Sequence, residues 1–298
     1  MLLAKLKFRL LTSVLVLLWC GNFIALKVCL RFLSPFGVTT FRVVVAAIVL
    51  LVIYGFWGGR QSPRKLCRQD ALDFLKLAFV GLFLNQTLFI LGLSQTNVAH
   101  SALMVTFGPV FTLLFAWMRG QERLRRMALL GMLVSVAGIA LMNLEKDFTF
   151  QTRYLVGDLL TLSGSIAFAY YTVISKNAVD RYGALDSTAF TYFAGALLFL
   201  PWGLPLMARL DWLHLPWSGV ASFFYVAFLS SVLAQLIFYY ALRRMSASSL
   251  ASLQYLQPVI TTIFSVLLLS EHLSLNFVVG GCIIIGGIIL THSNVRRT

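Results

Sequence analysis

The sequence predicts an all-α integral membrane protein with ten transmembrane helices, arranged as two inverted five-helix repeats. Three observations predict this fold. Apolar residues make up 59% of the 298-residue chain and charged residues only 11%, which is too little charge to cover a soluble protein of this size. Long runs of the sequence contain no charged residue at all. The two halves of the chain also match each other when they are aligned without a gap.

The first half contains five predicted spans, each close to the roughly 20 residues that a helix needs to cross the hydrocarbon core. The apolar run 10–26 is followed by basic residues and no small-residue cleavage motif, which favours a retained helix near 10–29 over a signal peptide. The second span lies near 35–57. The charge-free run 77–118 is too long for one crossing, and a polar stretch divides it into spans near 72–93 and 97–118. The fifth lies near 126–143.

The second half contains five further spans, in runs that are almost free of charge. They lie near 154–176, 187–208, 217–242, 246–269 and 273–292. Spans and short connectors use almost the whole chain, so no sizeable soluble domain is expected. Sixteen of the 24 basic residues fall on the side that holds both termini, and four fall on the opposite side. Because basic residues favour the cytoplasmic side, this multi-pass chain is expected to have both termini in the cytoplasm, in a plasma membrane such as the bacterial inner membrane.

A shift of 149 residues, half the 298-residue chain, aligns the two halves. The aligned pairs are residues that composition alone would not place in one register: Pro109 with Pro258, Glu122 with Glu271, Lys27 with Lys176, Gln86 with Gln235, and Gly131 with Gly280. Residues 1–149 and 150–298 are therefore predicted to be two repeats of five spans. Because five is odd, the second repeat enters the membrane from the opposite side. Inverted repeats with a site between them are a recurring plan of secondary transporters.

Several segments resemble the EamA type of the drug/metabolite transporter superfamily. Residues 19–27 (WCGNFIALK) resemble its first-helix signature, and residues 34–36 (SPF) followed by Arg42 are similar to its second helix. Residues 157–172 resemble the opening of its second repeat, and residues 270–273 (SEHL) with Gly280 and Gly287 resemble its closing hairpin. The resemblance covers essentially the whole chain. It implies a ten-helix carrier from a family that handles amino acids, nucleosides, sugars and drugs.

Polar and aromatic residues on the faces of several spans are predicted to line a cavity for the cargo. Trp19 and Asn22 share one helical face, and an Asn in mid-membrane is costly unless it meets a polar partner or water. The predicted cavity residues are Trp19, Asn22, Asn85, Gln86, Phe89, Phe168, Tyr171, Gln235, Tyr239, Gln254 and Tyr255, with Ser165, Phe238 and Gln257 beside them. Interhelical packing by the same side chains is the alternative, above all for Gln86 and Gln235.

Pro109 and Pro258 lie near the centres of their spans and predict a kink or hinge, because a proline removes one backbone hydrogen bond. Carbonyl groups freed there can face the cavity. Four charged residues are predicted to support the site, namely Lys27, Arg42, Glu122 and Glu271. Lys27 can instead anchor its span by snorkelling, whereas Arg42 lies deeper and is expected to face protein or water. For the two glutamates, a carboxylate that favours a helix N-terminus is a sufficient alternative.

The chain lacks the sequence signatures of other protein classes. No Asp or Glu lies in the central part of a predicted span, so no buried carboxylate proton relay is expected. It has no Walker, His-Glu-x-x-His or Gly-x-Ser-x-Gly motif, so neither ATP-driven transport nor a membrane protease or lipase is indicated. We expect no enzyme activity, no cofactor and no metal site. The basic residues are scattered between apolar runs, which argues against a nucleic-acid partner.

These expectations describe an alternating-access secondary transporter that exports a small amphipathic metabolite, such as an amino acid and in particular an aromatic one. The combination of aromatic and amide side chains suits a cargo with a flat or apolar body and polar groups. Its expected partners are this small-molecule substrate and the lipid bilayer, and the chain is expected to be a monomer or weak oligomer. A nucleobase, nucleoside or drug exporter of the same fold is the alternative. From other classes, the alternatives are a membrane enzyme and a non-transporting sensor.

Overall fold

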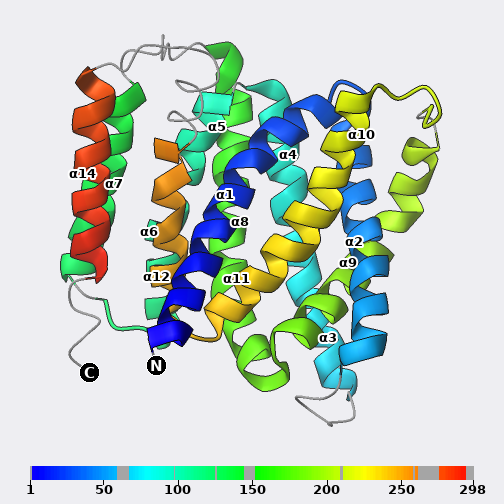
Figure 1. Cartoon of the computed structure of the whole chain (residues 1–298), viewed down its shortest axis with the longest axis horizontal. Coiled ribbons are helices and arrows are strands. Elements are labelled where there is room, and N and C mark those ends of the chain that lie inside the picture. Colours follow the sequence, from blue (N-terminus) through cyan, green and yellow to red (C-terminus); the bar gives the residue numbers. More distant parts are fainter. Residues whose placement is uncertain are drawn as a thin grey trace.

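The computed structural model describes residues 2–58, 67–96, 98–124, 126–143, 152–208, 211–257, 259–260 and 275–292. Every regular element within these ranges is a helix, and the helices stand side by side in a bundle (Figure 1). The prediction of an all-helical chain is confirmed for this part of the sequence. Helix α1 begins and helix α14 ends at the same end of the bundle (Figure 1).

The helices of the first half follow the predicted spans. They are α1 (Leu2–Cys29), α2 (Pro35–Trp57), α3 (Arg68–Ala78), η1 (Phe79–Leu84), α4 (Asn85–Gln95), α5 (Val98–Val105), α6 (Gly108–Met118) and α7 (Arg126–Asn143). Elements α3, η1 and α4 are consecutive and together form one long helix with a π-helical centre. The fourth predicted span is divided in two, because α5 ends at Val105 and α6 begins at Gly108.

The second half repeats this order of elements. They are α8 (Thr152–Tyr182), α9 (Ala184–Met207), α10 (Trp217–Phe224), the π-helix η2 (Tyr225–Leu233), α11 (Ala234–Leu242), α12 (Ala247–Ala251), the 3-10 helix η3 (Ser252–Tyr255) and α14 (Leu275–His292). The π-helices η1 and η2 end at residues that the 149-residue shift pairs, Leu84 and Leu233. The later part of the predicted span 246–269 lies outside the described residues.

Six helical segments of the described residues are long and apolar enough to cross a membrane. They are Leu6–Cys29, Pro35–Trp57, Arg68–Gln95, Ser101–Met118, Ala184–Met207 and Trp217–Leu242, and the shorter apolar helices Arg126–Leu141 and Val278–Thr291 accompany them. Helix α8 is 31 residues long but is absent from this set, because Ser, Thr and Tyr side chains occupy its centre and lower its hydropathy. This helix carries three residues that the sequence predicts in or beside the cavity, Ser165, Phe168 and Tyr171.

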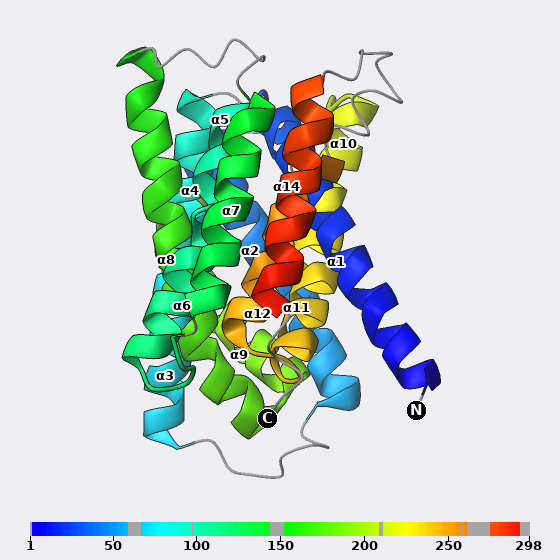
Figure 2. The ribbon, with the colours of Figure 1, turned by 90° about the vertical axis from the view of Figure 1, so that its left-hand side faces the viewer.

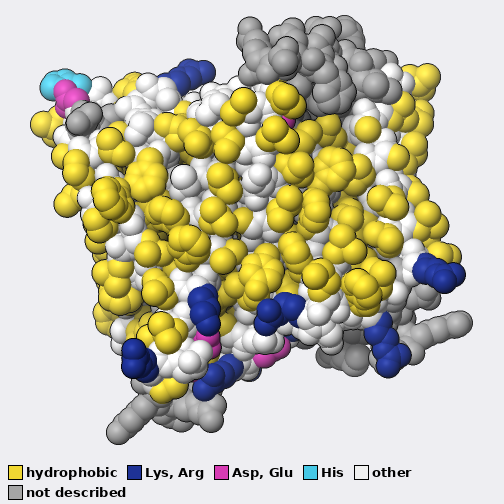
Figure 3. Space-filling model, turned by 180° about the vertical axis from the view of Figure 1, so that it is seen from behind, with side chains coloured by type: hydrophobic (Ala, Val, Ile, Leu, Met, Phe, Trp, Pro, Cys, Tyr) yellow, Lys and Arg dark blue, Asp and Glu magenta, His cyan; other side chains and the backbone are white. Residues whose placement is uncertain are grey.

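The outer surface is apolar around the middle of the bundle. Figure 3 shows hydrophobic side chains covering this band, while most Lys and Arg side chains gather at the lower edge. Exposed apolar side chains of the described helices include Ile48, Val52, Leu133, Leu197 and Ile289. A band of this kind is stable in contact with lipid and would be a large aggregation-prone patch in water.

The two halves pack around each other through equivalent elements. Helix α2 packs along α9, and α7 packs along α14 (Figure 1). Helix α1 contacts α11, and α8 contacts α4, so the first helix of each half packs against the third helical segment of the other half. Helices α1 and α8 run in opposite directions along the bundle (Figure 2). The cavity described below therefore has walls from both halves.

Glycines permit the close crossing of α7 and α14. A Cβ atom on Gly131 would lie 2.5 Å from the carbonyl oxygen of Gly287, and a Cβ atom on Gly138 would lie 2.8 Å from that of Gly280. The 149-residue shift exchanges these two contacts, since it pairs Gly131 with Gly280 and Gly138 with Gly287. At the crossing, the Ser135 hydroxyl donates to the carbonyl of Ile284 at 3.3 Å. The match between the halves is thus visible in their contacts as well as in their sequence.

Candidate functional site

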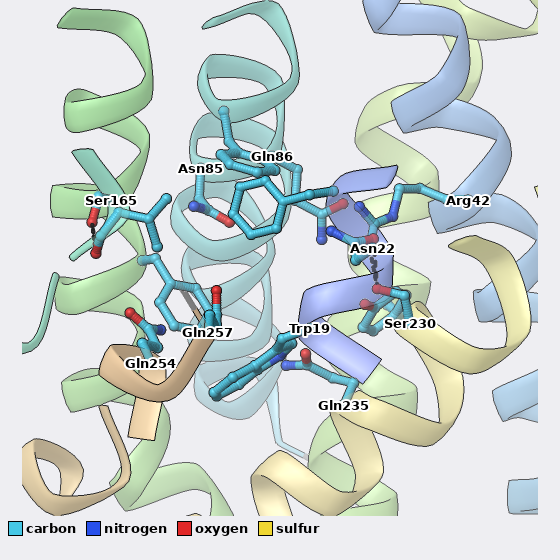
Figure 4. Close-up of a pocket in the computed structure, with 15 residues that line it drawn as sticks. Trp19, Asn22, Arg42, Asn85, Gln86, Ser165, Ser230, Gln235, Gln254 and Gln257 are labelled. Atoms are coloured by element: carbon cyan, nitrogen blue, oxygen red, sulfur yellow. Dashed lines mark hydrogen bonds between the residues drawn. The ribbon is translucent and has the colours of Figure 1, made fainter. Parts of the chain in front are cut away.

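A cavity of about 120 Å3 lies in the middle of the bundle (Figure 4). This is roughly ten times the space that one water molecule requires. Its lining residues come from both halves: Trp19, Asn22, Phe23, Arg42, Asn85, Gln86, Phe89, Val105, Ser165, Phe168, Tyr192, Ser230, Gln235, Gln254 and Gln257. The described residues of the lining provide amides, hydroxyls, one guanidinium and several aromatic rings, and none of them carries a carboxylate. A cavity of this size and polarity can hold water or a small polar molecule.

Most of the predicted cavity residues meet in this lining. Eight of them line it, namely Trp19, Asn22, Asn85, Gln86, Phe89, Phe168, Gln235 and Gln254, and so does Arg42. They come from α1, α2, α4, α8, α11 and η3. The structure therefore brings together residues that are up to 235 positions apart in the sequence.

Three predicted tyrosines lie outside the lining. Tyr171 and Tyr239 are buried immediately behind Gln235, which donates from its Nε2 to the Tyr171 hydroxyl at 2.9 Å. The Tyr171 and Tyr239 hydroxyls are 2.6 Å apart, and the Tyr239 hydroxyl also donates to Ser175 at 3.4 Å. Tyr255 is buried in an apolar cluster with Leu113 and Met132. These tyrosines support the lining or the bundle, and the prediction that they face the cavity is not met.

A chain of hydrogen bonds fixes the cationic side of the cavity. Arg42 donates from Nε to the Ser231 hydroxyl at 2.9 Å and from Nη2 to the Ser230 hydroxyl at 3.2 Å. The Ser230 hydroxyl in turn donates to Oδ1 of Asn22 at 2.7 Å, as Figure 4 shows. Both serines belong to the π-helix η2, an irregularity that is frequent at functional sites. These hydrogen bonds hold the Arg42 side chain in one position. The side chain is almost completely buried.

The side-chain amides of Asn85 and Gln86 differ in their hydrogen bonds. Asn85 donates from Nδ2 to the carbonyl of Gly164 at 2.8 Å and so ties α4 to α8. Gln86 Oε1 is buried and has no hydrogen-bond partner among the described residues. A buried acceptor without a partner is costly. The Gln86 carbonyl is therefore available to a donor that enters the cavity.

Aromatic rings form the apolar part of the cavity. Phe23 and Phe89 meet edge to face with ring centroids 5.4 Å apart. The ring centroids of Phe168 and Phe238 are 5.6 Å apart, and those of Trp19 and Phe238 are 6.1 Å apart. These are favourable separations for aromatic pairs. The rings form a wall against which an apolar or planar part of a molecule can pack.

The break between α5 and α6 coincides with Pro109, which occupies the first turn of α6. Proline has no N–H to give to the residue four positions earlier, here Val105. The freed Val105 carbonyl accepts a hydrogen bond from the Ser165 hydroxyl at 3.2 Å, at the wall of the cavity. The Val105 carbonyl therefore has a hydrogen-bond donor from α8 in place of the N–H that Pro109 lacks. Pro258, its predicted counterpart, lies outside the described residues.

The charged support residues have different positions. Lys27 donates from Nζ to the carbonyls of Leu93 and Thr96 at 2.6 and 2.8 Å, at the end of α4. Glu122 accepts from the backbone N–H of Ser248 at 3.0 Å and also from its hydroxyl. Its carboxylate thus binds the N-terminus of α12 in the other half, instead of the helix that follows it in the sequence. Glu271 lies outside the described residues.

Sequence reasoning missed four residues of the lining, Phe23, Val105, Tyr192 and Ser230. Phe23 and Val105 look like ordinary apolar residues of a span, and nothing in the sequence separates them from their neighbours. The pair Ser230–Ser231 carried a usable signal, since two hydroxyls lie in the middle of the charge-free run 215–242. A search for partners of the membrane-embedded Arg42 would have found them.

Comparison with known proteins agrees with this architecture. A protein of Archaeoglobus fulgidus named "Uncharacterized transporter" is 28% identical over 286 residues, which cover 96% of this chain and 97% of that protein. A protein of Streptantibioticus cattleyicolor named "Probable terminal-alkyne amino-acid exporter" is 26% identical over 283 residues, covering 95% and 91%. A solved crystal structure with 20% sequence identity has the same fold, with a TM-score of 0.78 over 98% of both chains.

Two segments of the chain, residues 7–144 and 155–293, each match the EamA-like transporter family. The segments leave a short connector between them, close to the middle of the chain, and together they contain every lining residue of the cavity. The two-repeat architecture and the resemblance found in the sequence are thereby confirmed. This multi-helical membrane protein belongs to the EamA-like transporter family.

Proposed function

We propose that this transporter exports a small amphipathic metabolite, an amino acid, by alternating access. The observation that carries the proposal is the central cavity, whose lining combines Arg42 and several amide groups with the aromatic rings of Trp19 and Phe168. A polar region and an apolar region in one small space suit a cargo with charged or polar groups and an apolar side chain.

The halves of the chain act in this proposal as two inverted repeats of five membrane spans, residues 1–149 and 150–298. Support comes from the opposite directions of α1 and α8 (Figure 2) and from the exchanged glycine contacts of α7 and α14. The cavity lies between the repeats, so rocking of one repeat against the other exposes it to each side in turn. The break before Pro109 is the proposed hinge on one side, and Pro258 is its proposed counterpart.

The termini are proposed to lie in the cytoplasm and the protein in a bacterial inner membrane. The basic side chains at the lower edge of the bundle support this orientation, since α1 begins and α14 ends at that edge (Figures 1 and 3). A reporter active only in the cytoplasm should be active after Arg68 or Arg126 and inactive after Gln95. An inactive reporter at the C-terminus would contradict the ten-span topology and the inversion of the repeats.

Amino acids are the proposed cargo class for two reasons. The relative from Streptantibioticus cattleyicolor carries the name of an amino-acid exporter. The cavity also offers Arg42 and several amide groups, which suit carboxylate and ammonium groups. The aromatic wall favours a second candidate, a nucleobase, nucleoside or drug with a flat ring. We propose that the protein works as a monomer or weak oligomer, since the cavity is enclosed by one chain.

Counterflow in proteoliposomes tests the proposed function. Purified protein is reconstituted into vesicles loaded with one unlabelled solute, and uptake of the same labelled solute is followed for the L-amino acids and the common nucleosides. We expect accelerated exchange of one or more amino acids over protein-free vesicles. Exchange of nucleosides alone would favour the second candidate, and exchange of none of these solutes would contradict the proposal.

A further inference from the structure

Arg42 is a buried cation with neutral partners. Its side chain is 6% exposed, and its hydrogen bonds go to the hydroxyls of Ser230 and Ser231. Among the described residues, carboxylates form ion pairs with Lys76, Lys176, Arg181 and His214, and none pairs with Arg42. The positive charge of Arg42 is therefore not balanced within the described protein.

An unbalanced charge at this depth is expensive, because burial removes its hydration and no opposite charge replaces it. The two serines account for two of the five guanidinium N–H donors. The remaining donors belong to a side chain that lines the cavity. An anion that enters the cavity would provide both the missing charge and the missing acceptors.

We infer that Arg42 binds the carboxylate of a monocarboxylate cargo, with Ser230 and Ser231 holding the guanidinium in position. The inference rests on the proposed function, since it identifies the central cavity as the cargo site. The planar guanidinium presents paired N–H groups that match the two oxygens of a carboxylate. One positive charge without a neighbouring cation in the lining matches one negative charge. A phosphate ester, with about −1.5 to −2 charges at neutral pH, would remain partly unbalanced.

The differences between the two halves support an anion site at Arg42, which the repeat-equivalent position lacks. The 149-residue shift pairs Arg42 with Thr191, Ser230 with Gly81, and Ser231 with Leu82. The cation and both of its hydroxyl partners therefore occur together at Arg42. At the repeat-equivalent position, Thr191, all three are absent. In that place, Gly81 makes room for the Tyr171 ring, to which an added Cβ atom would come within 2.2 Å.

Gln86 extends the inference from a carboxylate to an α-amino acid. Figure 4 shows its amide near Asn22 and Arg42, and its buried Oε1 atom has no partner among the described residues. The ammonium group of an α-amino acid is separated from the carboxylate by one carbon atom. A carboxylate on Arg42 therefore brings a three-donor ammonium group into the region of this acceptor.

Ligand binding to purified protein tests this assignment. Dissociation constants are measured by calorimetry for the L-amino acids, for their α-carboxamides, which keep the ammonium group but lose the carboxylate, and for nucleosides. Wild type should bind the preferred acid more tightly than its carboxamide by roughly 10- to 100-fold. Arg42→Gln should reduce this ratio to near one. The matched control is Thr191→Val at the repeat-equivalent position, which should leave the ratio unchanged.

Thermal stability without ligand separates binding from a structural role. Removal of an unbalanced buried charge should leave the melting temperature of Arg42→Gln equal to or higher than that of wild type. If this variant does not fold, Arg42→Lys takes its place, because it keeps the charge without the paired N–H geometry. The ratio of acid to carboxamide affinity should then be smaller than in wild type, and an unchanged ratio would overturn the inference.

Equal binding of acids and carboxamides by wild type would also overturn the inference. So would a preference for acids that survives in Arg42→Gln. Binding of nucleosides alone, with counterflow of the same nucleosides, would overturn the carboxylate assignment but leave alternating-access transport intact. Absence of counterflow for every solute would contradict the proposed function itself.

Discussion

Gln86 and Gln235 are equivalent in sequence but not in their surroundings. The Gln235 amide donates to Tyr171 and joins the buried tyrosine network behind the cavity. Gln86 Oε1 has no partner among the described residues. The sequence left a binding role and a packing role open for both residues, and their different hydrogen bonds lead to a different expectation for each. We expect Gln86 to contribute to binding and Gln235 to contribute to both binding and stability.

Replacement of these glutamines by leucine should separate the two roles. Gln86→Leu should weaken cargo binding by roughly 2- to 100-fold, since it removes a hydrogen bond worth about 0.5–3 kcal/mol according to the charge of the partner. Its melting temperature in detergent should stay near that of wild type. Gln235→Leu is the matched comparison and should lower the melting temperature as well, because Tyr171 loses its donor. Equal losses of stability in both variants, with unchanged affinity, would place both residues in the scaffold.

The sequence predicted the site residues where helical periodicity was sufficient. Trp19 and Asn22 lie three residues apart on a regular helix, and both line the cavity. Phe168 and Tyr171 have the same spacing on α8, yet only Phe168 lines it, because periodicity defines a face and not the distance of a side chain from the cavity. Ser230 escaped prediction because the π-helix η2 changes the register of the residues that face inward.

Lysines at the ends of long helical segments hold each half together in the same way. Lys27 reaches the carbonyls of residues 93 and 96, and Lys176 reaches the equivalent carbonyls of residues 242 and 245 at 2.5 and 3.5 Å. Carbonyls at a helix C-terminus lack intrahelical donors and favour a positive charge. The sequence left open whether Lys27 anchors its span by snorkelling. The structure places its ammonium group on the end of α4.

Lys27→Met should therefore destabilise the protein without changing its cargo affinity. Loss of charge-assisted hydrogen bonds to two carbonyls is expected to cost about 1.5–3 kcal/mol. The measurement is thermal unfolding in detergent, paired with ligand binding on the same sample. Lys76→Met is the control, because the exposed Lys76–Asp73 pair is 3.8 Å long and pairs of this kind contribute little. Equal melting temperatures for the two variants would contradict the capping role.

The disturbance of the fourth span could be predicted, but not the point at which α5 ends and α6 begins. Pro109 indicated a disturbed helix. It could not indicate that α5 would end at Val105, because the Val105 carbonyl finds its donor on Ser165, 60 residues later. A local sequence pattern cannot predict a hydrogen-bond partner that comes from the other half of the chain. The same limit applies to the partner of Glu122, which lies 126 residues away.

Pro109→Ala should slow transport while leaving protein yield near the wild-type level. Alanine restores the N–H that can bond the Val105 carbonyl, and it is well tolerated in a helix. If the break acts as a hinge, the rate of counterflow should fall several-fold with little change in cargo affinity. Pro205→Ala, within α9 and outside the cavity lining, is the control and should exchange at the wild-type rate. Equal exchange rates for both variants would make the break a packing feature.

At the scale of the whole molecule, the internal match of the sequence was the most informative observation. It predicted paired elements, and the structure has α2 against α9 and α7 against α14. It also predicted that the halves would build one cavity between them, and the lining contains residues of both. It could not predict the volume of the cavity or its one-sided charge, because these depend on which neighbours surround Arg42 in three dimensions.

Water accessibility of the cavity from each side of the membrane tests the central claim most directly, and it requires no knowledge of the cargo. Cysteine is introduced at Asn22, in the lining, and at Ile24, a lipid-facing position two residues away that is 59% exposed. Both variants are made in a background whose own four cysteines are replaced by serine or alanine. Membrane-impermeant thiol reagents are then applied to right-side-out and inside-out vesicles.

We expect Asn22→Cys to react from both sides of the membrane and Ile24→Cys to react from neither. Alternating access further predicts that cross-linking the Glu122–Ser248 contact between the halves, through cysteines at these two positions, restricts the reaction of Asn22→Cys to one side. Failure of Asn22→Cys to react from either side would contradict a water-accessible central site. Reaction from both sides at an unchanged rate in the cross-linked protein would contradict alternating access.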